Sequence, residues 1–151
     1  MAVVLGLDYG RRRIGLALSD ATGTLAAAAG CHRTPEDGSI LEHLRELMRE
    51  REITAIVVGL PLTADGREGE MAQAARRFAE RLAAELALPV HLVDERYSSQ
   101  EADLWLRKSR RGGDRHKRAG RPKGLRDAVA AELILQQFLD ARGRADAQER
   151  T

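Results

Sequence analysis

The sequence predicts a mixed α/β domain, and three observations support this fold class. Short runs rich in β-branched and apolar residues, typical of strands, alternate with longer stretches whose apolar residues recur every three or four positions, typical of helices. Three such strand-like runs precede the first helical stretch. The chain has 151 residues, 43% of them hydrophobic, which suits one buried core. We therefore expect a single domain over residues 1–142.

The predicted domain begins with three strands and a helix. Residues 2–8 and 13–19 flank a turn with three consecutive arginines, which is typical of a hairpin, and residues 24–33 add a third strand. "SILEHLREL" then opens a helix, because Ser39 and Glu42 have the spacing of a capping box.

Strands and helices alternate in the rest of the chain. Residues 54–62 and 89–96 predict strands, and a long helix is expected between them. Its apolar stripe consists of Met71, Ala75, Phe78, Leu82 and Leu86. The spacing of Ser98 and Glu101 predicts a further helix, and residues 125–142 predict the last one.

Positive charge is concentrated in one segment, although the net charge is only +2. Residues 107–126 contain ten Lys or Arg and one acid, so this segment carries +9 and the remainder −7. Glycines and a lack of apolar residues predict a mobile arm at about residues 107–124, and its single sign of charge favours a polyanion-binding role over a solvated linker. Its candidate nucleic-acid contacts are Arg110, Arg111, Arg115, Lys117 and Arg118.

We expect a cytoplasmic protein without a membrane partner. No stretch is apolar for long enough to span a membrane, and no secretory signal is visible at the N-terminus. The single cysteine, Cys31, cannot form an internal disulfide, which favours a reducing compartment. The four histidines match no zinc spacing. Residues 143–151 are expected to form a disordered tail.

Acidic residues lie where the predicted strands end. Asp8 interrupts the apolar run of the first strand, although a single aspartate there could equally cap the turn. Asp94 and Glu95 end the strand at 89–96, and alternation puts them on opposite faces, so only one can enter a shared site. Gly6 and Gly10 beside Asp8 would let a backbone approach closely, or would satisfy a turn or a packing constraint.

A further acid, Asp127, heads the last predicted helix. Its helical spacing to Ala131, Ile134 and Phe138 predicts that it faces inward, whereas Glu132, Gln136 and Asp140 are expected on the solvent side. Stabilising the helix N-terminus is the alternative role. Acids at two strand ends and a helix start, beside a cationic arm, favour a Mg²⁺ or Mn²⁺ site acting on a phosphodiester over three separate structural roles.

Four motifs resemble, in order, those of the YqgF/RuvX family. They are "LDYGRRRIGLALSD", "VVGLPLTADGREGEMAQAARRFAERL", "VDERYSSQEA" and "DAVAAELILQQFLD". The resemblance implies a ribonuclease H-like fold, in which a central mixed sheet opens with three antiparallel strands and is flanked by helices. It places the catalytic and metal-binding acids of the family on Asp8, Glu95 and Asp127. Arg126, where the family often has an apolar residue, leaves the local helix register open.

The resemblance also implies a function. It indicates a nuclease that matures the 5′ end of pre-16S ribosomal RNA in ribosome biogenesis, with pre-ribosomal particles as a further partner. Holliday junction resolution on DNA is the alternative. We expect Arg11, Arg12, Arg13 and Arg96 to contact phosphates. Monomeric action on RNA is favoured because no apolar stripe is left over for a dimer face.

Two other functional classes compete with the nuclease. "DYGRRRIGLALSD" also resembles the first phosphate loop of actin-like and sugar kinases, but 151 residues provide one of the two domains that those proteins close around ATP. A non-catalytic RNA-binding module would need the basic arm but not Asp8, Glu95 and Asp127 together. The three acids therefore favour the nuclease.

Overall fold

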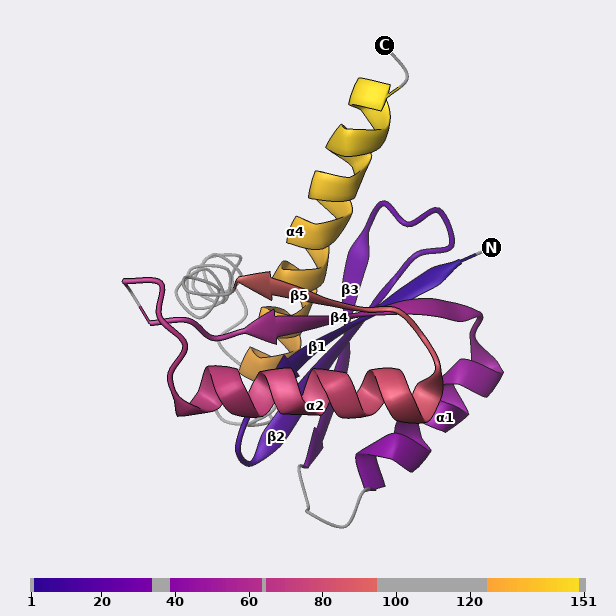
Figure 1. The fold of residues 1–151 in the computed structure, drawn as a ribbon. Helices are drawn as coiled ribbons and strands as arrows, with labels where there is room; N and C mark the ends of the chain where they lie inside the picture. Colours follow the sequence, from indigo (N-terminus) through magenta and orange to yellow (C-terminus); the bar gives the residue numbers. More distant parts are fainter. Residues whose placement is uncertain (1, 34–38, 64, 95–124, 150–151) are drawn as a thin grey trace, which may run out of the picture.

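A five-stranded sheet forms the centre of the computed structural model, which describes residues 2–33, 39–63, 65–94 and 125–149 (Figure 1). The strands are β1 (Val3–Tyr9), β2 (Arg13–Ser19), β3 (Ala26–Arg33), β4 (Ile53–Leu60) and β5 (Val90–Asp94). They lie side by side in the order β3-β2-β1-β4-β5. The first three strands pair antiparallel, whereas β1, β4 and β5 are parallel. The mixed sheet predicted from the sequence is confirmed.

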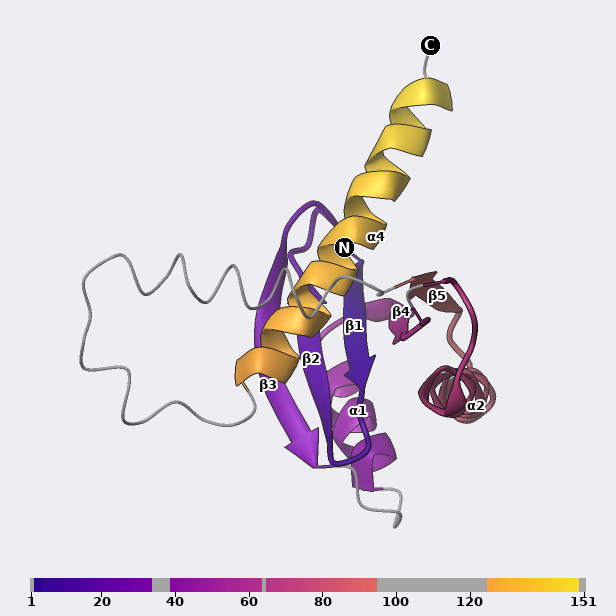
Figure 2. The same cartoon turned by 90° about the vertical axis from the view of Figure 1, so that its left-hand side faces the viewer.

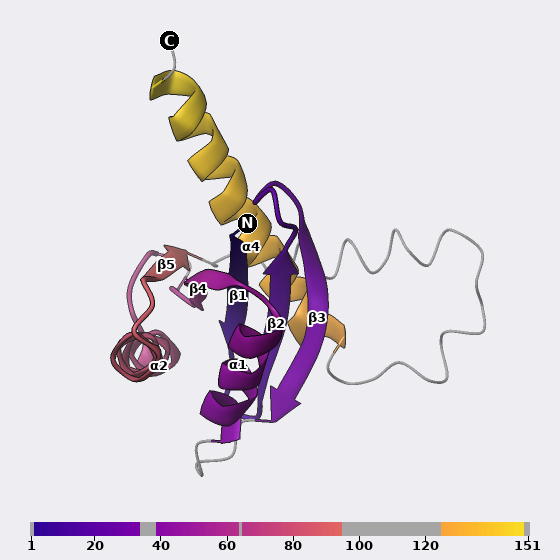
Figure 3. The ribbon, with the colours of Figure 1, turned by 90° about the vertical axis from the view of Figure 1, so that its right-hand side faces the viewer.

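Helices cover both faces of this sheet. They are α1 (Ser39–Glu50), α2 (Glu70–Leu86) and α4 (Leu125–Glu149). In Figure 2, α4 lies in front of the sheet, and in Figure 3, α1 lies in front of it with α4 behind. Within the described segments, none of the helices is both long and apolar enough to cross a membrane. The helix expected after Ser98 and the basic arm at 107–124 lie outside the described residues.

Two apolar cores result from this layering. One core lies between the sheet and α1 with α2, and it includes Leu5, Leu7, Ile56, Leu44 and Leu82. The other lies between the sheet and α4, and it includes Val4, Val57, Ala131, Ile134 and Leu135. Successive residues of β1 and β4 thus enter opposite cores. Burial on both faces explains why these strands read as continuous apolar runs in the sequence.

Close backbone packing explains Gly6 and Gly10. A Cβ on Gly6 would lie 2.7 Å from the Cβ of Leu135 and 3.2 Å from the carbonyl oxygen of Ala131, so Gly6 lets α4 pack against β1. A Cβ on Gly10 would lie 2.6 Å from the carbonyl oxygen of Arg13, within the turn. The close approach expected at these glycines is therefore made by the chain itself.

Helix α4 is longer than predicted, and the face that was expected to be exposed to solvent is partly covered. It continues to Glu149 and projects beyond the sheet, so residues 143–149 extend the helix where a disordered tail was expected (Figure 1). Gln136, expected at the solvent side, accepts a hydrogen bond from Ala26 N–H at 2.9 Å and donates one to the Thr24 carbonyl at 2.9 Å. Glu132 is also half-buried, and burial raises the pKa of its carboxyl group. The edge strand β3 lies under this face of the helix, which sequence periodicity could not indicate.

Candidate active site

The predicted acids of β1 and β5 belong to the same edge of the sheet. Leu7 of β1 pairs with Val58 of β4, and β5 ends at Asp94 beside the end of β4. Because these three strands are parallel, Asp8 and Asp94 lie at their common carboxyl edge. Glu95 follows Asp94 directly in the chain and lies outside the described residues. Open α/β sheets bind ligands at this kind of edge.

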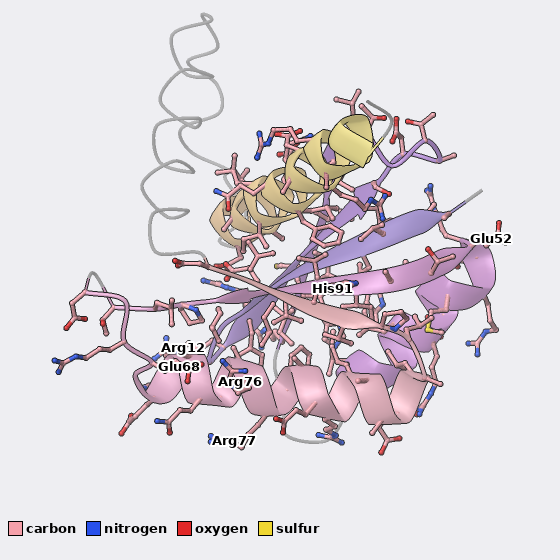
Figure 4. All side chains as sticks on the ribbon, turned by 45° about the horizontal axis from the view of Figure 1, so that its top comes forward. Arg12, Glu52, Glu68, Arg76, Arg77 and His91 are labelled. Atoms are coloured by element: carbon pink, nitrogen blue, oxygen red, sulfur yellow. The ribbon has the colours of Figure 1, made fainter. Side chains whose placement is uncertain are left out.

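Asp8 and Asp94 point toward opposite faces of the sheet. Asp8 shares its face with Val4, which is buried beneath α4. On β5, the ring of His91 lies 5.0 Å from that of Phe138 on α4, so the odd-numbered residues of this strand face α4 (Figure 4). Asp94 is exposed, and as an even-numbered residue of β5 it points toward the face opposite to that of His91. The expectation that Asp94 does not share a site with Asp8 agrees with this geometry.

Gly15 brings the start of α4 to Asp8. Asp8 and Gly15 are directly opposed in the β1–β2 pair. A Cβ on Gly15 would lie 1.9 Å from the carbonyl oxygen of Asp127 and 3.0 Å from the backbone nitrogen of Ala128, so the first turn of α4 rests on this glycine. Directly opposed residues of antiparallel strands have Cα atoms roughly 5 Å apart. Asp8 and Asp127 therefore lie at one corner of the sheet.

An ion pair fixes the side chain of Asp127 at this corner. Arg13 Nε donates a hydrogen bond to Asp127 Oδ2 at 3.1 Å. The arginine side chain is 34% exposed and the aspartate 30%, so the pair is partly shielded from water. Ala131 and Ile134 on the same stripe are fully buried, which confirms the inward direction predicted for Asp127. Arg126 thus does not displace Asp127 from the inner face of the helix.

The other arginines of the β1–β2 turn lie on the α2 side. Arg11 donates hydrogen bonds to Met71 Sδ at 3.1 Å and to Glu70 Oε2 at 3.4 Å, both at the start of α2. Arg11 and Arg77 line a shallow groove there together with Tyr9. Arg12 is exposed, and Figure 4 shows it and Arg77 at the N-terminal half of α2. The sequence did not single out Arg77, because surface arginines on a helix have no distinctive pattern.

Part of the predicted site lies outside the described residues. This applies to Glu95 and Arg96, and also to Arg110, Arg111, Arg115, Lys117 and Arg118 of the arm. Among residues 2–33, 39–63, 65–94 and 125–149, no group of three or more His, Cys, Asp or Glu side chains could hold a metal ion. The described part of the corner supplies two carboxylates, Asp8 and Asp127, and Arg13, which pairs with Asp127.

Gly15 is the main site residue that the sequence prediction did not identify. A glycine inside an apolar strand often marks the close approach of another backbone. That indication was present in "RIGLALS", but the approaching segment begins more than a hundred residues later. Only the folded chain identifies it as the first turn of α4.

Comparison with protein families and curated proteins gives consistent matches over nearly the whole chain. Residues 2–141 match the RuvX family, described as "Holliday junction resolvase". A protein of Thermosynechococcus vestitus, named "Putative pre-16S rRNA nuclease", is 42% identical over 144 residues, which cover 95% of this chain and 91% of the relative. A protein of Anaeromyxobacter sp. (strain K) with the same name is 45% identical over 138 residues, 91% of this chain and 96% of the relative.

Junction-resolving enzymes are among the solved structures with similar folds. Thermus thermophilus RuvC in complex with a Holliday junction substrate has a TM-score of 0.52 and 21% identity, over 94% of this chain and 96% of that one. The Fowlpox virus resolvase in complex with Holliday junction DNA has a TM-score of 0.58 and 10% identity, over 92% of this chain and 97% of that one. At these identities the likeness concerns the fold, and it confirms the ribonuclease H-like architecture.

Proposed function

The chain belongs to the RuvX (YqgF) family of nucleases, and we propose that it hydrolyses precursor ribosomal RNA in a reaction that depends on a divalent metal ion. The observation that carries this proposal is the corner where Gly15 brings Asp127 beside Asp8. Two carboxylates from segments far apart in the chain converge at the carboxyl edge of the sheet. That arrangement suits a shared chemical task better than two independent caps.

We propose that Asp8, Asp127 and Glu95 hold Mg²⁺ or Mn²⁺. Carboxylate oxygens are the ligands that these hard cations prefer. The described residues fit such a site, because Asp8 and Asp127 are half-buried carboxylates at one corner. Glu95 would complete the set from the residue after β5. A divalent cation bound there supplies charge stabilisation for phosphodiester hydrolysis.

We propose that the chain's own cations bind the nucleic-acid backbone beside this corner. Arg11 and Arg12 lie at the adjacent turn, and the groove that Arg11 lines with Arg77 and Glu70 extends onto α2. Arg96 and the basic arm, which lie outside the described residues, would add further contacts. Contacts to phosphates position a strand without reading its sequence, so recognition of one cleavage site would need RNA structure or a pre-ribosomal particle as well.

RNA is the favoured substrate because relatives of 42% and 45% identity carry the name of an rRNA nuclease. The structures with DNA junctions share only 10% and 21% identity with this chain, so they bear on the fold and not on its substrate. The description of the family as a junction resolvase keeps DNA junction cleavage as the second candidate.

Cleavage assays on matched substrates test the proposed function. We expect the chain to cut an RNA with a 5′ precursor extension in Mg²⁺ or Mn²⁺ and to be inactive in EDTA. The rate per subunit should not change when the protein is diluted to a monomer, because trimming one strand needs one active site. Paired symmetric nicks in a four-way DNA junction, with the RNA left intact, would instead assign the resolvase function. Failure to cut any of these substrates would favour a non-catalytic RNA-binding module over a nuclease.

Charge removal in the arm tests its binding role. Replacing Arg110, Arg111, Arg115, Lys117 and Arg118 by glutamine should weaken binding of all RNA sequences alike. The slope of log affinity against log salt should become shallower by about 0.7 for each phosphate that the arm no longer neutralises, because fewer counterions are released. Filter binding at a series of salt concentrations measures this slope. A slope equal to that of the unmodified protein would mean that the arm is a linker.

A further inference from the structure

Arg13 differs from the other two arginines of its turn in the groups that it faces. Its Nε lies 3.1 Å from Asp127 Oδ2, and both side chains are about two-thirds shielded from water. Arg11 instead pairs with Glu70, whose side chain is 92% exposed, and Arg12 is exposed to solvent. The charge of Arg13 is therefore directed at the corner of Asp8 and Asp127, whereas the other two charges are directed elsewhere.

The charges at this corner make the Arg13–Asp127 ion pair depend on whether a metal ion is bound. Two carboxylates at one corner repel each other, and Arg13 compensates the charge of Asp127. Arg33 of β3 lies opposite Arg13 in the strand register, so a second positive charge is close by. A divalent cation bound by Asp127 would compete with Arg13 for this carboxylate, because both would be attracted by the same negative charge. Metal binding would therefore weaken the contact between the guanidinium group and Oδ2.

We propose that Arg13 is the counter-ion of Asp127 before metal binding, and that the metal ion displaces it and frees its guanidinium group for the phosphodiester substrate. This inference rests on the proposed function for its second step. A guanidinium group suits both partners, because its planar N–H donors fit carboxylate and phosphate oxygens equally well. Arg13 is thus a positioning residue until the metal binds, and a substrate-binding residue afterwards.

This double role predicts opposite effects of one substitution. Arg13→Gln keeps an N–H donor near Asp127 but removes the positive charge that competes with the cation. Metal affinity should therefore increase, whereas cleavage should become slower because no positive charge at this position binds the phosphate. A residue that only stabilised the fold would not give these two opposite changes.

Calorimetric titration with Mn²⁺ alone, without nucleic acid, measures the first effect. We expect the Mn²⁺ dissociation constant of Arg13→Gln to fall about two- to fivefold, as for release of a partly exposed ion pair. Arg12→Gln is the matched control, since it removes the same charge from the neighbouring residue and should leave the constant unchanged. Arg13→Lys keeps the charge and should restore the affinity of the unmodified protein. Circular dichroism checks that each variant is folded.

Single-turnover cleavage of the precursor RNA at saturating Mn²⁺ measures the second effect. Arg13→Gln should be slower by roughly 10- to 100-fold, the value of a hydrogen bond to a charged group. Unchanged or weaker Mn²⁺ binding in Arg13→Gln, or an equal gain of Mn²⁺ affinity in Arg12→Gln, would overturn the counter-ion role. Normal cleavage by Arg13→Gln would overturn its role in substrate binding. An unmodified protein that binds Mn²⁺ but cuts no RNA would refute the proposed function and with it the second step, while the counter-ion role would stand. One that binds no Mn²⁺ would refute both the proposed function and the counter-ion role.

Discussion

Asp8→Asn should abolish cleavage of RNA while the protein remains folded and still binds nucleic acid. The amide keeps the shape of the carboxylate but loses the charge with which Asp8 would hold a divalent cation beside Asp127. We expect the cleavage rate to fall by at least about a hundredfold, since even indirect partners of metal ligands contribute 10- to 100-fold. RNA affinity measured in EDTA should stay near its original value, because the binding cations are unchanged.

Asp94→Asn is the matched control for this substitution. Asp94 lies at the same edge of the sheet but is exposed and alternates away from the face of α4. Its replacement should change the cleavage rate by no more than about twofold, as is usual for surface substitutions. Comparable losses in both variants would indicate a general effect of acidic charge at the edge. Cleavage by Asp8→Asn at the original rate over a range of Mn²⁺ concentrations would refute the proposed acidic site.

Gly15→Ala should both destabilise the protein and inactivate it. The new Cβ would lie 1.9 Å from the carbonyl oxygen of Asp127, a backbone atom that no side-chain rotation can move away. Helix α4 must therefore shift from β2, which we expect to lower the free energy of unfolding by about 3 kcal/mol. The melting temperature should fall by roughly 6 to 12 °C. Because the shift carries Asp127 away from Asp8, cleavage should also be abolished below the melting temperature.

Gly143→Ala provides a control within the same helix. Gly143 is exposed in α4, and a Cβ there would meet no atom within 4 Å. This substitution should raise stability by about 0.5 to 1 kcal/mol, because alanine favours the helix over the unfolded chain, and should leave cleavage unchanged. Thermal melts followed by circular dichroism compare the two variants. A Gly15→Ala protein that melts like the unmodified protein would show that α4 is not anchored at this glycine.

The order of elements and the burial of the central strands could be predicted from the sequence, because apolar runs and helical periodicity record burial locally. Leu5 and Leu7 alternate with Val4 and Gly6 between the two cores, and such runs are typical of strands covered on both faces. The inward direction of Asp127 followed from its helical spacing to Ala131 in the same way. The end of α4 was not predictable, since the polar residues from 143 onward fit an exposed helix as well as a tail.

The interactions that assemble the candidate site were decided only by the tertiary structure. Arg13 and Asp127 are 114 positions apart, and no local pattern in either segment indicates which residue the other will meet. Their pairing depends on α4 crossing β2 at Gly15, and this crossing depends on the packing of α4 over the sheet. Gln136 illustrates the same limit, because its position in the helix suggested solvent until β3 was placed beneath it. Periodicity tells which side of an element is buried, whereas the neighbour on that side is determined by packing across the whole chain.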